Sequence, residues 1–208
     1  MTLFRKLINK LLKNIELNGE VLDLGGGKDA GYIKLFKGDF RITTADIDLK
    51  RKPDIVFDFE TAPFPLVNNK YDNVLLINVL EHIYNFKELF QESFRILKLN
   101  GNIIIVVPFL HQIHPSPKDY FRYTKECLER ILLESGFSEI EISEIGFGAF
   151  SAIYNLTQRF FPSFLCFFLE KTSVFIDKFL AHIGKIFSRK YDGKEYPLGY
   201  LIKARKIA

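Results

Sequence analysis

The 208-residue sequence predicts one α/β domain, residues 1–208, built on a doubly wound, mostly parallel sheet of seven strands with a helical insertion before the last strand. Three observations predict this fold class. Short apolar runs alternate with longer segments of helical periodicity, a triple glycine follows the first run, and acidic residues follow the next ones. Hydrophobic residues make up 48% of the chain and charged residues 26%, which excludes a disordered chain.

Residues 1–17 open the chain with apolar side chains at helical spacing, which predicts an amphipathic helix. Two interpretations stay open. The helix packs on the domain, or it lies in a membrane interface with a basic face toward the lipid headgroups. The basic residues of that face are Arg5, Lys6, Lys10 and Lys13. Charges interrupt the segment throughout, so it is not predicted to be a secretory signal.

The remaining elements alternate in the order that a parallel sheet requires. The run at 102–108 is nearly all apolar, as in a strand covered on both faces. Right-handed crossovers restrict such a chain to a doubly wound sheet, whose ligands bind at the carboxyl ends of the strands. We expect strands at 20–24, 40–45, 54–57, 73–77, 102–108, 140–145 and 199–206, and helices at 30–36, 86–97 and 119–136.

The first strand runs into Gly25, Gly26 and Gly27, which let the backbone turn sharply and approach a ligand. Asp46 lies 21 residues beyond Gly25, at the tip of the neighbouring strand, where a carboxylate can accept hydrogen bonds from ribose hydroxyls. Together they predict an adenosine-type cofactor. The glycine spacing also fits a dinucleotide fingerprint, but Asp29 in the same turn would repel a phosphate.

From Glu20 to Val107 the sequence resembles the class I S-adenosylmethionine-dependent methyltransferases. The resemblance rests on the run Val21–Gly27, on acids after the second and third strands, and on the segment 78–82 after the fourth. It implies the Rossmann-like methyltransferase fold and S-adenosyl-L-methionine as cofactor. The glycine turn would hold the methionine half, and the two acids the ribose and the adenine. The implied cofactor-binding residues are Asp23, Gly25, Gly26, Gly27, Asp46, Ile47, Asp58, Phe59 and Asn78.

The segment 108–124 follows the fifth predicted strand and is rich in imidazole, phenol and guanidinium groups. It resembles a subgroup of these methyltransferases with a His, a spaced Pro and then Asp-Tyr-Phe-Arg-Tyr-Thr. An oxygen acceptor must lose its proton, and a histidine suits that role, so His114 or His111 is the candidate base. Candidate substrate-binding residues are Tyr120, Arg122 and Tyr123. The alternatives are structural loop histidines and an ion pair between Arg122 and Asp119.

His82 could serve as a second base, although the resemblance implies that it supports the cofactor pocket. The four histidines and two cysteines show no spacing typical of a metal site, so no metal is expected. The cysteines, Cys127 and Cys166, are too few for a disulfide-stapled secreted fold, which favours a reducing compartment such as the cytoplasm.

The insertion at 147–197 is basic and aromatic. Residues 147–208 hold 10 Lys and Arg against 4 Asp and Glu, and the ten-residue apolar run at 160–169 is too short to span a bilayer. Three interpretations compete: a lid over the acceptor site, a patch on the inner membrane surface, or a homodimer interface. In the membrane interpretation the residues toward anionic lipid are Lys178, Lys185, Arg189 and Lys190.

The expected activity is methyl transfer from S-adenosylmethionine to an oxygen of a small-molecule, lipid-linked or saccharide-linked acceptor. The alternatives are a regulatory protein that binds the cofactor without catalysis, and an NAD-dependent oxidoreductase. Residues 1–146 carry 19 basic and 21 acidic groups, and this slightly acidic body favours no nucleic-acid partner.

Overall fold

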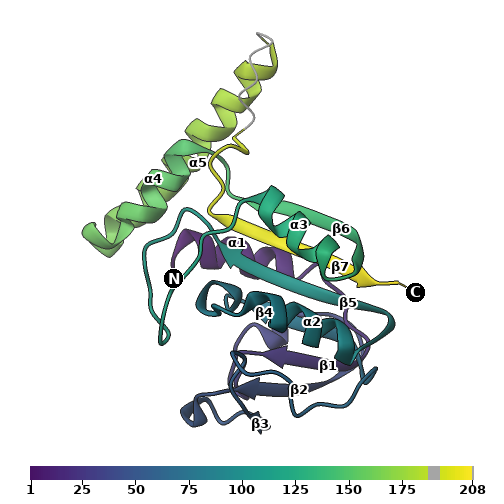
Figure 1. Cartoon of the computed structure of the whole chain (residues 1–208). Coiled ribbons are helices and arrows are strands. Elements are labelled where there is room, and N and C mark those ends of the chain that lie inside the picture. Colours follow the sequence, from purple (N-terminus) through teal and green to yellow (C-terminus); the bar gives the residue numbers. More distant parts are fainter. Residues whose placement is uncertain (187–192, 208) are drawn as a thin grey trace.

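The computed structural model describes residues 1–186 and 193–207, and its centre is a seven-stranded sheet (Figure 1). The strand order is β3-β2-β1-β4-β5-β7-β6, with β7 antiparallel to both of its neighbours and the other pairs parallel. This confirms the predicted sheet. The strands are β1 (Gly19–Leu24), β2 (Phe40–Asp46), β3 (Ile55–Val56), β4 (Tyr71–Ile77), β5 (Leu97–Pro108), β6 (Phe137–Ile145) and β7 (Gly199–Lys206).

Helices cover both faces of the sheet, as Figure 1 shows. One face packs against α2 (Phe86–Ile96) and α3 (Lys125–Glu134), and the other against α1 (Leu3–Leu12). The central strands are apolar on both faces because both faces are covered. In β5, for example, Ile103 belongs to the first core and Ile104 to the second.

The helix predicted at 30–36 is wrong, because the chain forms only a 3₁₀ turn, η1 (Ile33–Leu35). A seven-residue segment that contains Gly31 has too few hydrogen bonds to offset the cost of nucleating an α-helix. The N-terminal helix is shorter than predicted and ends at Leu12. Its apolar residues Phe4 and Ile8 are buried in the core. The packing interpretation is therefore confirmed, and this apolar face is not available to a membrane.

The helix predicted at 119–136 begins only at Lys125. The preceding residues are held in an irregular loop, in which the Asp119 carboxylate accepts hydrogen bonds from the His114 backbone N–H at 2.8 Å and from the Arg122 guanidinium. Thr124 then caps α3, because its hydroxyl accepts from the backbone N–H of Cys127 at 3.3 Å.

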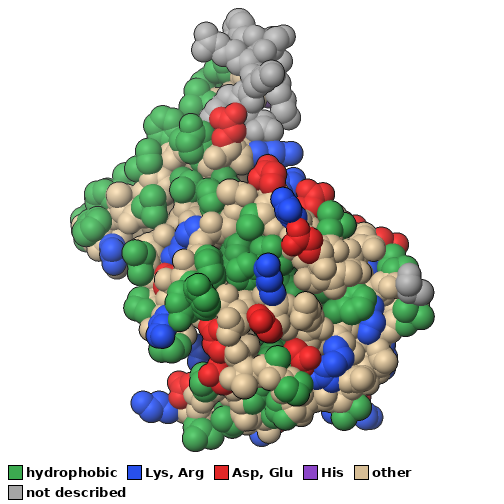
Figure 2. Space-filling model, viewed as in Figure 1, with side chains coloured by type: hydrophobic (Ala, Val, Ile, Leu, Met, Phe, Trp, Pro, Cys, Tyr) green, Lys and Arg blue, Asp and Glu red, His purple; other side chains and the backbone are tan. Residues whose placement is uncertain are grey.

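The insertion forms an arm, α4 (Ala149–Thr157), a 3₁₀ turn η4 (Gln158–Phe160) and α5 (Ser163–Ile186), which projects beyond the sheet in Figure 1. Apolar side chains gather on its surface in Figure 2. Within the described residues, no helix combines the length and the apolar character that a membrane span needs. The exposed large apolar residues of the arm are Phe150, Ile153, Leu156, Phe160, Phe161, Phe164, Phe167, Phe168, Phe175, Phe179 and Leu180.

The cap of α3 leads to a stability prediction. Replacing Thr124 with Ala removes the side-chain oxygen that caps the N-terminus of this helix, and should lower the free energy of unfolding by about 1 kcal/mol. Urea unfolding measures the change. Thr124→Ser keeps the oxygen and should stay near wild type. An equal loss in both variants would contradict a capping role.

Candidate cofactor and acceptor site

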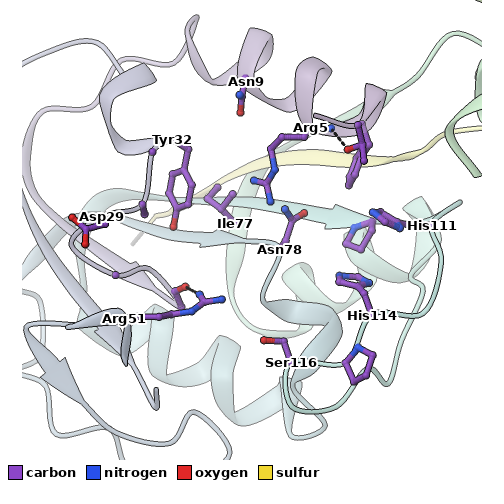
Figure 3. A pocket seen from close by; sticks show the side chains of 18 of the residues that line it. Arg5, Asn9, Asp29, Tyr32, Arg51, Ile77, Asn78, His111, His114 and Ser116 are labelled. Carbon is purple, nitrogen blue, oxygen red and sulfur yellow. Dashed lines mark hydrogen bonds between the residues drawn. The ribbon is translucent and has the colours of Figure 1, made fainter. Parts of the chain in front are cut away.

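Two adjoining cavities lie at the carboxyl ends of the central strands, and Figure 3 shows the larger one from close by. Their volumes are about 880 and 520 Å³. Both are lined by Gly25 after β1, Asn78 after β4, Ser116 from the loop after β5, and Arg51. The shared walls make the two cavities neighbouring parts of one site.

The glycine turn after β1 depends on the absence of side chains. Gly25 has φ of +86°, and a Cβ built there would lie 2.3 Å from a methyl carbon of Val79. A Cβ on Gly26 would lie 1.9 Å from Asp23 Oδ2. Gly25 and Gly27 line the larger cavity, whereas Gly26 packs behind the turn and lines neither cavity.

Asp23 is fully buried behind this turn and lines neither cavity. The Tyr32 hydroxyl donates a hydrogen bond to its Oδ2 at 2.7 Å. Burial raises the pKa of the Asp23 carboxyl to about 7, and the nearby Asp46 carboxylate adds to the shift. Tyr32 lies on the wall of the larger cavity, and Asp23 lies behind Tyr32, away from the cavity. Asp23 therefore supports the glycine turn and does not face a ligand in the cavity.

The smaller cavity contains the acids predicted after β2 and β3. Asp46 is 7% exposed, and its Oδ1 accepts from the backbone N–H of Asp48 at 2.8 Å. Asp58 and the buried ring of Phe59 line the same cavity, together with Ile47. An acid at the strand tip, a second acid and an aromatic ring thus line one cavity, and their contacts to ribose and adenine stay predictions.

Arg51 lies between the cavities, in the 3₁₀ turn η2 (Leu49–Arg51). Its Nη1 donates to the Gly25 carbonyl oxygen at 2.8 Å and to Asp46 Oδ2 at 3.3 Å. It links the glycine turn to the acid of β2. Sequence reasoning missed Arg51, because nothing in its surroundings in the chain distinguishes it from other surface arginines.

Asn78 marks the end of β4 and has φ of 54°, a conformation that asparagine tolerates better than most residues. Its Oδ1 is buried without a hydrogen-bond partner among the described residues, although Asn78 lines both cavities. A buried acceptor at a cavity wall is a group that a ligand donor would satisfy.

The N-terminal helix contributes to the larger cavity, which the sequence did not predict. Arg5 and Asn9 of α1 line it, and Figure 3 shows Arg5 among the labelled side chains around its centre. The sequence places Arg5 on the basic face of this helix, but nothing in the sequence indicates which residues surround it. The next residue, Lys6, faces α5 and pairs with Glu170 at 2.7 Å.

His111 and His114 both line the larger cavity, with ring centroids 4.9 Å apart in a stacked arrangement. His111 also contacts the ring of Phe4, which lies nearly perpendicular to it. Burial, assisted by the neighbouring His114 and Arg122, lowers the pKa of His111 to about 4. Its Nδ1 is buried without a hydrogen-bond partner in the part of the chain that the structure describes.

His114 directs both of its ring nitrogens toward protein oxygens. Nδ1 lies 3.1 Å from the Gln112 carbonyl oxygen, and Nε2 lies 3.5 Å from Glu81 Oε1. The Glu81 carboxylate raises the pKa of His114. Glu81 Oε1 also lies 3.6 Å from His82 Nε2, so the fold brings together three potential metal ligands that show no metal-site spacing in the sequence.

The three predicted substrate residues lie in different surroundings. Tyr120 lines the smaller cavity. Arg122 lines neither cavity, and its guanidinium pairs with Asp119 at 2.5 and 2.7 Å, as the structural alternative expected. Tyr123 is 4% exposed, belongs to the core under α2 and α3, and lines neither cavity. Tyr120 alone among the three lies on a described cavity wall.

Comparison with known proteins supports the same interpretation of the fold. Residues 2–141 match the model of a family described as a methyltransferase domain. An uncharacterised protein of Methanocaldococcus jannaschii is 38% identical over 109 residues, which cover 48% of this chain and 46% of that protein. The chain therefore spans about half the length of this curated relative.

Two solved structures have the same fold at low sequence identity. An S-adenosylmethionine-dependent methyltransferase of Archaeoglobus fulgidus is 16% identical with a TM-score of 0.57, over 98% of this chain and 92% of that one. Phosphoethanolamine N-methyltransferase 2 of Haemonchus contortus, in complex with S-adenosyl-L-methionine, is 18% identical with a TM-score of 0.54, over 98% and 52%. The chain belongs to the methyltransferase domain family, with the fold of class I enzymes whose cofactor is S-adenosylmethionine.

Proposed function

We propose that this protein transfers the methyl group of S-adenosylmethionine to an oxygen of a small-molecule, lipid-linked or saccharide-linked acceptor. The observation that carries the proposal is the pair of adjoining cavities at the sheet edge, one lined by Asp46 and Asp58 and the other by two histidines. The smaller cavity suits a nucleoside, and the larger one leaves room for an acceptor beside it. The cofactor supplies an electrophilic methyl group on a sulfonium that is already a good leaving group.

The chain's own residues fit this cofactor. The glycine turn forms a cradle that a Cβ at Gly25 would fill, and Asn78 Oδ1 is a buried acceptor in need of a donor. Asp46 would hold the ribose, and Asp58 with Phe59 the adenine. Asp29 lines the larger cavity, where its charge disfavours the pyrophosphate of a dinucleotide and so weighs against the oxidoreductase alternative.

For the acceptor proton, we place the base at His111. Both ring nitrogens of His114 face protein oxygens, whereas the His111 ring lies on the cavity wall and burial lowers its pKa to about 4, which keeps it in the neutral form that accepts a proton. Phe4 and His114 both contact the His111 ring and limit its orientation. Orientation of the acceptor against a fixed base is the main contribution that such a site can make.

The structure of the arm favours the membrane interpretation of the insertion over the lid interpretation. No residue of the described part of the insertion lines either cavity. The two acids of α5 are engaged, since Glu170 pairs with Lys6 and the buried Asp177 accepts from the backbone N–H groups of Phe150 and Ser151. The exposed surface therefore combines apolar rings with basic groups such as Lys171, which suits anionic lipid.

The membrane interpretation also names Lys178, Lys185, Arg189 and Lys190. Lys178 is described, and its ammonium lies over the ring of Phe147. The side chains of Lys185, Arg189 and Lys190 lie outside the described residues. The membrane proposal therefore rests on the apolar rings and on the basic residues between 159 and 178.

The ribose contact leads to the first functional prediction. Asp46→Asn removes the charge that would accept from two hydroxyls, and should weaken binding of S-adenosylhomocysteine about 10- to 100-fold by calorimetry. Asp39→Asn is a matched control, because Asp39 precedes β2 at the opposite end of the same strand. Equal binding by wild type and Asp46→Asn would contradict the assignment.

The base leads to the second prediction. His111→Gln should lower kcat about 100-fold without changing the affinity for S-adenosylhomocysteine, because the loss affects proton removal and not cofactor binding. Formation of S-adenosylhomocysteine across a panel of hydroxyl acceptors measures turnover. His182→Gln, on the exposed surface of α5, should keep wild-type turnover. Full turnover by His111→Gln would exclude His111 as the base.

The arm leads to the third prediction. The protein should float with phosphatidylglycerol vesicles at low salt and not with phosphatidylcholine vesicles. Phe164→Ser with Phe168→Ser should abolish flotation, because both rings are largely exposed on the arm. Leu99→Ser, at an exposed apolar residue in β5 away from the arm, is the control. A concentration-dependent dimer that the double variant dissociates, without flotation, would favour the dimer interface instead.

A further inference from the structure

The buried carboxylate of Glu81 is the starting point. Glu81 is 0% exposed, and both of its carboxylate oxygens are buried without a hydrogen-bond partner within residues 1–186 and 193–207. A buried carboxylate without donors carries a large desolvation cost, so native structures compensate it with a cation or with hydrogen bonds. The groups that face Glu81 Oε1 are the Nε2 atoms of His82 and His114, at 3.6 and 3.5 Å.

The opposite ring nitrogens determine which protons these imidazoles carry. His82 Nδ1 lies 2.6 Å from the carbonyl oxygen of Lys118, and His114 Nδ1 lies 3.1 Å from that of Gln112. A carbonyl oxygen only accepts, so each Nδ1 carries the hydrogen and donates it. In the neutral rings both Nε2 atoms then present lone pairs to a carboxylate that also presents lone pairs. Three acceptors that converge in this way are compensated either by a proton on one ring or by a metal cation between them.

The distances suit a metal ion. The three ligand atoms lie within 4.8 Å of one another. Metal–ligand bonds of about 2.1 Å in tetrahedral geometry place ligand atoms about 3.4 Å apart, close to the two distances from Glu81 Oε1. Metal-binding histidines commonly donate their other ring N–H to a backbone carbonyl, which is the arrangement of both rings here.

The location of the cluster connects it to the acceptor. His114 lines the larger cavity and His82 the smaller one, so the cluster lies where the two cavities adjoin. Three protein ligands leave coordination positions for oxygen atoms of another molecule. Two imidazoles and one carboxylate favour zinc and the divalent ions of iron, cobalt and manganese over magnesium, which prefers oxygen ligands.

We propose that Glu81, His82 and His114 form a binding site for one divalent transition-metal ion, which holds a hydroxyl acceptor by its oxygen at the junction of the cavities. The metal site stands on these three residues alone, and its role in holding the acceptor rests on the proposed function. Metal coordination favours the deprotonated form of a bound hydroxyl. The acceptors expected are therefore hydroxyl compounds able to coordinate a divalent cation.

The test titrates the full chain, after treatment with EDTA, with Zn²⁺ in a calorimeter. We expect one Zn²⁺ per chain, and an affinity for Zn²⁺ at least tenfold lower in Glu81→Gln and in His114→Gln. His182→Gln should bind Zn²⁺ as wild type does. Titration with Co²⁺ should produce visible absorption bands in wild type that both ligand variants lose, whereas Mg²⁺ should give no heat of binding at the same concentrations.

Binding of S-adenosylhomocysteine to each variant shows whether it is folded and separates the two proposals. Should a ligand variant fail to bind it, His82→Gln takes its place. If wild type binds Zn²⁺ but not S-adenosylhomocysteine, the metal site is supported and the proposed function is contradicted. Two outcomes would overturn the metal site alone: the chain binds the cofactor but not one equivalent of Zn²⁺, or Glu81→Gln and His114→Gln leave Zn²⁺ binding unchanged. Either outcome would indicate that a proton neutralises Glu81.

Discussion

The alignment of the parallel strand ends is the constraint on which the site depends. In register, Leu24 of β1 pairs with Ala45 of β2, and Ile77 of β4 pairs with Val106 of β5. The residues that follow these strands are therefore brought to one edge of the sheet, although Gly25 and Ser116 lie 91 positions apart in the sequence. The glycine turn completes the edge, because only a residue without a side chain fits between β1 and Val79.

The sequence predicted those parts of the structure that depend on local pattern. The apolar runs located the strands. The positions of Gly25 and Asp46 after two neighbouring strands placed both on the cavity walls, because ligands bind at the carboxyl ends of the strands in this fold. The helix at 30–36 failed because a short helix depends on tertiary contacts more than on its own residues. Seven strands were expected and seven formed, with the last one inserted antiparallel between β5 and β6.

The remainder of the site depends on contacts between distant segments. Nothing near Glu81 in the chain indicates that His114 lies 3.5 Å away, and nothing near Arg5 indicates a cavity wall. Tyr120 and Tyr123 are three residues apart in an irregular loop, and their different surroundings follow from how that loop is pinned by Asp119. Such orientations have no periodicity, so no pattern in the sequence reports them.

The short helix α1 contacts both the larger cavity and the arm. Its Arg5 lines the larger cavity, while the adjacent Lys6 is tethered to Glu170 on the arm and the Phe4 backbone N–H is bonded to Asn155 Oδ1 at 3.1 Å. The contacts to the arm and the cavity lining thus fall on three consecutive residues, 4 to 6, of one helix. A substitution that shifts α1 would therefore alter the seat of the arm and the wall of the larger cavity together.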